Sequence, residues 1–189
     1  MKKTFLASFA AAAFLALPAV VAHAQMDTMK DPMVGGAAMY PSKTIVENAV
    51  NSPIHTTLVA AVKAAGLVDT LNSPGPFTVF APTNDAFAKL PAGTVDTLLK
   101  PENKATLTRI LTYHVVPGRI TAKDIAAGIK AGGGKYEMKT VEGGTLTATM
   151  SGKKIMLTDE KGGMATITTV NVYQSNGIID VIDSVLMPS

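Results

Sequence analysis

The segment Thr78-Val79-Phe80-Ala81-Pro82-Thr83-Asn84-Asp85-Ala86-Phe87 decides how this 189-residue chain folds, and the other elements can be placed outward from it. Its apolar first half is typical of a buried strand, which Pro82 ends because proline has no backbone N–H for a sheet. Thr83 or Asn84 can then cap a turn that carries Phe87 inward. Every phenylalanine beyond residue 24 lies within these residues or just before them, so we expect the core to form here.

A second apolar stretch follows about 100 residues later, in a chain that has no cysteine or tryptophan. It reads Asn176-Gly177-Ile178-Ile179-Asp180-Val181-Ile182-Asp183-Ser184-Val185-Leu186-Met187-Pro188. Its apolar positions favour a terminal strand, over Gly177–Ile182, that closes a sheet. Both stretches make physical sense as core, so they indicate a fold and say little about a ligand.

Between the two stretches the pattern changes from helical to alternating. Helices are predicted after a Thr44-x-x-Glu47 capping box, after Thr56 or Thr57, over 94–99 and 101–113, and after Thr121. Strands are predicted over 136–141, 145–150, 153–158 and 164–169, with glycine-containing turns between them. Helices followed by a meander predict an α+β fold, with the helices packed on one side or end of the sheet.

Residues 1–24 have the order of a secretory signal peptide. Lys2 and Lys3 precede an apolar run, and Ala22-His23-Ala24 is a small-x-small cleavage signal. We expect the mature chain to begin at Gln25, to be secreted to the periplasm or the cell surface, and to have no further membrane-spanning segment. Residues 25–42 show no helical or strand period and are predicted to be a flexible, methionine-rich tail.

Charge and cysteine content exclude several classes of function. Loss of the two N-terminal lysines leaves 15 basic and 14 acidic residues, a net charge of +1, so the basic pI is no argument for nucleic acid. The absence of cysteine excludes disulfides, thiolate metal sites and a cysteine nucleophile.

Three segments resemble the fasciclin (FAS1) domain family. Residues 78–87 look like its first signature box and residues 176–188 like its second, and Leu111-Thr112-Tyr113-His114 is similar to its central Tyr-His element. The resemblance covers residues 43–188 and implies one exported FAS1 domain, a β-wedge or sandwich-like sheet with several short helices packed on one side. It also implies a role in cell adhesion or matrix contacts. The fold-signature residues that it marks are Thr78, Phe80, Pro82, Asn84, Phe87, Gly177, Ile179 and Asp183.

Candidate contact residues lie near the central element and before the second box. The Tyr113–His114 pair either shapes an adhesive surface or is core, with a buried histidine hydrogen-bonded to backbone or hydroxyl groups. The resemblance also points to Asn171, Val172 and Asn176. Animal relatives have an Asp-Ile pair at the positions of Asn171 and Val172, so integrin-type binding is not expected, and Asp180 stands where the family more usually has histidine.

Two readings of function remain. The first is a non-catalytic, monomeric binding module for a cell-surface or matrix protein or polysaccharide, without a cofactor; the chain contains none of the common hydrolase, zinc-protease or nucleotide-binding motifs. The second is a Cu(I)-binding or stress protein of the periplasm, which would use four tail methionines, because thioethers are soft ligands. These are Met26, Met29, Met33 and Met39.

Overall fold

The computed structural model describes residues 31–189. Its main sheet has seven strands in the order β4-β3-β9-β8-β7-β6-β5. These strands are β3 (Phe77–Pro82), β4 (Val115–Pro117), β5 (Lys135–Lys139), β6 (Thr145–Ser151), β7 (Lys154–Thr158), β8 (Met164–Gln174) and β9 (Gly177–Ile182). The long β8 pairs with β7 through its first residues and with β9 through the rest, so it joins the two parts of the sheet.

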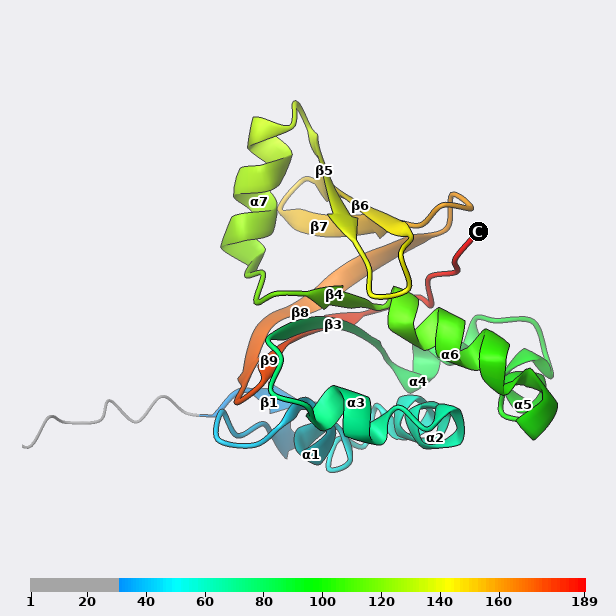
Figure 1. Ribbon diagram of the computed structural model, residues 1–189. Helices are drawn as coiled ribbons and strands as arrows, with labels where there is room; N and C mark the ends of the chain where they lie inside the picture. Colours follow the sequence, from blue (N-terminus) through cyan, green and yellow to red (C-terminus); the bar gives the residue numbers. More distant parts are fainter. Residues whose placement is uncertain (1–30) are drawn as a thin grey trace, which may run out of the picture. The chain divides into compact units, whose positions relative to one another are not determined.

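Helices cover this sheet at two separate places (Figure 1). At one end of the view lie α1 (Ile45–Ala49), α2 (Thr56–Ala65) and α3 (Val68–Asn72), with α4 (Asn84–Ala88), α5 (Thr94–Leu98) and α6 (Lys104–Tyr113) beside them. At the other end α7 (Ala122–Ala131) packs against β5 and β6. A short 3₁₀ helix, η1 (Pro101–Asn103), precedes α6. The fold is α+β, as predicted.

The two boxes form the middle of the sheet. β3 and β9 pair in parallel, with Val79 opposite Ile179 and Phe80 opposite Asp180. Both strands are buried on both faces, as expected for parallel strands in the interior of a sheet. One face contributes Val79 and Val181 to a core under α1 and α2, and the other contributes Phe80 and Ile182 to a core with α7 and the meander; the first box therefore anchors both cores.

Several local predictions are confirmed, and their errors have identifiable causes. Thr44 and Thr121 form the capping boxes of α1 and α7, and Gly66 ends α2 in the left-handed conformation. The prediction that β9 closes the sheet was wrong: it lies between β3 and β8. The first threonines of α2 do not cap it either, because Asn84 of α4 accepts the Thr57 N–H at 3.0 Å instead.

The prediction of a flexible tail was wrong for residues 31–42. Met33–Val34 (β1) pairs with Ala37–Ala38 (β2), and Val34 and Met39 are buried in the core beneath α1 and α2. The Tyr40 N–H also donates to Asn48 at 3.0 Å. Two buried apolar side chains and these bonds are tertiary interactions, so the sequence shows no period that would reveal them. Residues 1–30, including the predicted signal peptide and cleavage site, lie outside the described residues.

Within residues 31–189, the longest helices have ten residues, and none combines the length and apolar character needed to cross a membrane.

Candidate functional site

A hollow of about 570 Å³ lies between α7, the β6–β7 hairpin and β8. We call it the lysine groove. Its walls carry three lysines above an apolar floor, and no carboxylate lines it. The lining residues are Ala122, Lys123, Ala126, Met150, Lys153, Lys154, Ile155, Ile167, Thr168 and Val170.

Local sequence places α7 along this groove. The Thr121 hydroxyl accepts the Asp124 N–H, and the Asp124 carboxylate accepts the Thr121 N–H at 2.9 Å, so the first turn is capped from within. Asn171, in a left-handed conformation with φ 57° at an irregular point of β8, accepts the Ala122 N–H at 2.8 Å. This bond ties the start of the helix to the strand that forms the groove floor.

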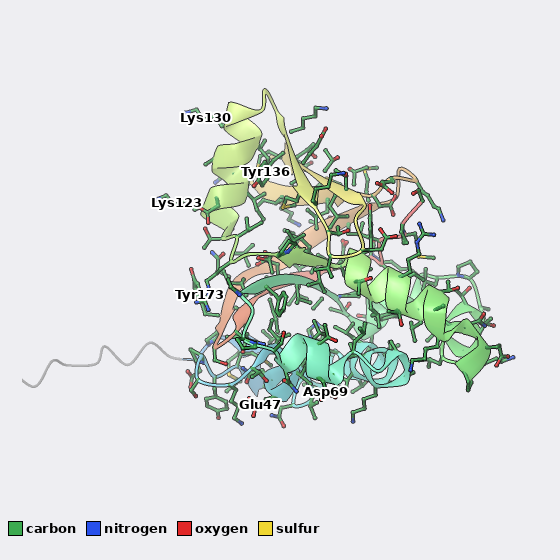
Figure 2. The ribbon with its side chains drawn as sticks, viewed as in Figure 1. Glu47, Asp69, Lys123, Lys130, Tyr136 and Tyr173 are labelled. Atoms are coloured by element: carbon green, nitrogen blue, oxygen red, sulfur yellow. The ribbon has the colours of Figure 1, made fainter. Side chains whose placement is uncertain are left out.

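The hairpin supplies the other two lysines. Gly152 adopts φ 60° in the turn, a conformation that favours glycine, and Lys153 and Lys154 follow it. Both lysines are exposed, and neither forms an ion pair in the described part of the chain. Figure 2 shows Lys123 and Lys130 on α7, well away from the acidic Glu47 and Asp69 at the helical end of the domain. The groove can therefore attract an anionic group.

The structure places Tyr113 and His114 in the core, so an adhesive surface made from them is excluded. Tyr113 donates its hydroxyl to the Thr145 carbonyl at 2.7 Å and accepts the Glu160 N–H at 3.2 Å, which fastens α6 to the meander. Burial raises the pKa of the Tyr113 hydroxyl to about 12. His114 is 2% exposed. Its Nδ1 contacts the Ile110 carbonyl at 2.8 Å, and Nε2 accepts the Leu186 N–H at 3.0 Å.

The contacts of His114 determine its protonation. The Leu186 N–H can only donate, so Nε2 is the acceptor and Nδ1 carries the hydrogen that Ile110 receives. Burial lowers the pKa of His114 to about 4, and the ring is neutral at physiological pH. It joins α6 to the C-terminal segment, which is the alternative interpretation of the Tyr-His element.

The other candidate contact residues divide between core and groove. Val172 is buried, and Asn176 accepts the Ile45 N–H at 3.0 Å and donates to the Leu71 carbonyl at 2.7 Å, so neither is available for a partner. Asn171 is half-buried and holds the Ala122 end of the groove. Of the five predicted contact residues, Asn171 alone adjoins the lysine groove.

Most fold-signature residues have structural contacts that account for their positions. Thr78 bridges two backbone groups in the loop before α7, donating to Gly118 at 2.7 Å and accepting from Ile120 at 2.9 Å. Asp183 accepts the Thr166 N–H at 2.7 Å. Gly177 leaves room for the Phe77 carbonyl, which a Cβ there would overlap. Asn84 is half-buried and accepts the Thr57 N–H at 3.0 Å. The other four signature residues, Phe80, Pro82, Phe87 and Ile179, are buried.

Asp180 is a buried acid that the sequence could not place. It is fully buried, one oxygen accepts the Asn171 N–H at 2.7 Å, and the other has no hydrogen-bond partner. Burial raises its pKa to about 6. No ion pair in residues 31–189 involves it, so it supports the bend of β8 near the groove through one bond only.

The methionine hypothesis loses part of its ligand set. Met39 is 2% exposed and packs in the core, whereas Met33 is 52% exposed and the other two methionines lie outside the described residues. Within residues 31–189, no three histidine or acidic side chains gather as a metal site would require.

Comparisons with known proteins agree with this architecture. A family model described as the Fasciclin domain matches residues 53–188. A solved pair of FAS1 domains from the insect cell adhesion molecule Fasciclin I superimposes with a TM-score of 0.68 at 20% identity, covering 77% of this chain and 51% of that chain. This chain therefore spans about half the length of the solved pair, and the likeness concerns the fold.

Bacterial relatives are closer in sequence. Protein sll1483 of Synechocystis is 50% identical over 169 residues, covering 89% of this chain and 87% of the relative. Immunogenic protein MPT70 of Mycobacterium tuberculosis is 38% identical over 184 residues, covering 95% and 85%. The cell surface glycolipoprotein MPB83 of Mycobacterium bovis is 38% identical over 160 residues, covering 82% and 64%.

Proposed function

Since the chain belongs to the fasciclin (FAS1) domain family, we propose that it is an exported, non-catalytic binding module that holds an anionic cell-surface or matrix polymer in the lysine groove. The observation that carries this proposal is the groove itself, in which three lysines border an apolar floor without an acidic neighbour in the lining. The core positions of Tyr113 and His114 move the contact surface away from the central element.

The composition of the groove indicates how it would bind. Three ammonium groups attract carboxylate or phosphate groups along a chain, and Met150 and Val170 offer apolar contacts between them. Surface attraction of this kind weakens as salt is added, because the Debye length falls to about 8 Å at physiological ionic strength. One such contact is weak, so firm adhesion requires many chains or a repeating polymer.

Export supports the same proposal. The predicted signal peptide would deliver the protein to the periplasm or cell surface, where polysaccharides and envelope proteins are present. A relative is named as a cell surface glycolipoprotein. The copper alternative has no comparable support, because Met39 is in the core.

A charge-reversal pair tests the proposal. Lys153→Glu with Lys154→Glu changes two groove lysines, and Lys100→Glu with Lys161→Glu makes the same change in net charge at two exposed lysines outside the groove. Binding to polygalacturonate, to neutral dextran of similar length and to isolated cell envelopes is measured at 20 and 150 mM salt. We expect the groove variant to lose at least tenfold in affinity for polygalacturonate and envelopes, and the control to lose less than threefold. Equal losses in both variants, or equal binding to dextran, would overturn the proposal.

A further inference from the structure

An apolar cavity of about 170 Å³ lies under the helical layer, mostly within a different core from the one beside the lysine groove. It is enclosed by α1, α2 and α3 on one side and by β3 and α6 on the other. The helical end of the domain, where it is located, is shown in Figure 1. None of its lining residues lines the groove, so its occupant would be independent of the proposed polymer.

Short side chains create the cavity. Seven of its fifteen lining residues are valine and one is alanine, contributed by three helices and by the strands β3 and β4. Leucine or phenylalanine at several of these positions would fill the space, as Phe80 and Leu111 do at its inner wall. The space therefore results from the short side chains that α1, α2 and α3 present to it.

The lining offers no hydrogen bond to water. Only Lys63 and His114 among the lining residues are polar. The Lys63 side chain is at the exposed side of α2, and both ring nitrogens of His114 are already bonded to the backbone. A water needs two to four polar partners to occupy a buried site, and an apolar cavity of about 150 Å³ in another protein stays dry and binds benzene or xenon.

The outer wall of the cavity is formed by partly exposed side chains. Val50, which lines the cavity, is 51% exposed, and Val46 and Val59 beside it are half-buried. A molecule can therefore enter by displacing side chains of α1, of the residue after it and of α2, without disturbing the sheet. We propose that this cavity binds one uncharged, ring-sized apolar molecule or group, of the size of toluene.

Ligand chemistry gives the sharpest test. Toluene and phenol have similar size, but the phenol hydroxyl would lose its hydrogen bonds to water inside the cavity. Binding to the purified protein is followed by valine and leucine methyl shifts in NMR spectra and by the rise in Tm. We expect saturable toluene binding that is at least tenfold tighter than phenol binding, with toluene NOEs to methyl groups of Val62 and Val79. No saturable toluene binding, or phenol binding as tight as toluene binding, would overturn the proposal.

A matched pair of variants locates the site. Val59→Phe fills the cavity from α2, and Ala64→Leu adds a side chain of similar size on the exposed face of the same helix. We expect the first variant to lose toluene binding and the second to retain it within twofold. Toluene binding that persists in the Val59→Phe variant would refute this location, and the NOEs in the unmodified protein decide the location should that variant fail to fold.

Discussion

Acidification should destabilise the domain through His114, because the folded state accepts only the neutral ring. The Leu186 N–H points at Nε2 at 3.0 Å, so a proton on Nε2 would face a donor and would break the link between α6 and the C-terminal segment. Burial lowers the pKa of His114 from its usual 6.5 to about 4. The stabilisation is therefore complete above about pH 6.5 and is lost as the pH falls towards 4.

The size of the effect follows from the shift. The pKa of His114 falls from 6.5 to about 4, and at about 1.36 kcal/mol for each unit of pKa this corresponds to about 3 kcal/mol of folding free energy. A typical domain has only about 5–15 kcal/mol in total, so the loss should be easy to measure. Asp180 affects stability in the opposite direction between pH 4 and 6, because burial raises its pKa and acidification therefore stabilises the fold. Its contribution cancels when two proteins that both contain Asp180 are compared.

Urea titrations from pH 4 to 8 give the free energy of unfolding of the unmodified protein and of His114→Gln, which both retain Asp180. The difference in free energy of unfolding between them should shrink by about 3 kcal/mol as the pH falls from 7.5 to 4. Imidazole ¹⁵N NMR should show the Nδ1–H form at pH 7 and a midpoint near pH 4. A midpoint near 6.5, or an Nε2–H tautomer, would refute the reasoning.

Three further changes test buried polar groups and close packing. Asp180→Asn removes a carboxylate whose pKa burial raises from 3.8 to about 6. The stability of this variant relative to the unmodified protein should increase by about 2 kcal/mol from pH 4 to 7.5, and a difference that does not vary with pH would contradict this. Asn176→Ala leaves the Ile45 N–H and two carbonyls without partners and should lower the free energy of unfolding by about 3 kcal/mol, whereas Ser175→Ala should change it by less than about 0.5 kcal/mol in the same urea titration. Gly177→Ala should cost about 2 kcal/mol, because its Cβ would meet the Phe77 carbonyl, and an unchanged urea midpoint would argue against that close approach.

Elements whose causes are local could be predicted from the sequence. The capping boxes at Thr44 and Thr121 and the left-handed Gly66 each depend on residues within one helical turn, and each is present in the structure. The meander from β5 to β8 follows from short turns between alternating segments. The predicted end of the fourth meander strand at residue 169 was too early, because β8 continues to Gln174 through an irregular region.

Features that depend on distant residues could not be predicted. The parallel pairing of β3 with β9 joins segments about 100 residues apart. An apolar run in the sequence predicts a strand but does not indicate which other strand it pairs with. The start of α2 is capped by Asn84, 27 residues away from Thr57. The burial of Met39 depends on packing against residues of α1 and α2, which follow it in the sequence, and the composition of its own segment does not reveal these contacts.

The candidate site was missed for a related reason. The residues that identify the family hold the fold together: Thr78 bridges the loop before α7, His114 fastens the C-terminal segment, and Asn176 joins α1 to α3. Side chains used in this way are not free to meet a partner. The lysine groove instead depends on Lys123 and on the adjacent Lys153 and Lys154, and only the fold brings Lys123 to this pair. Two proteins can therefore share every signature residue and still differ in what they bind, because the groove lining can change without disturbing the contacts that maintain the sheet.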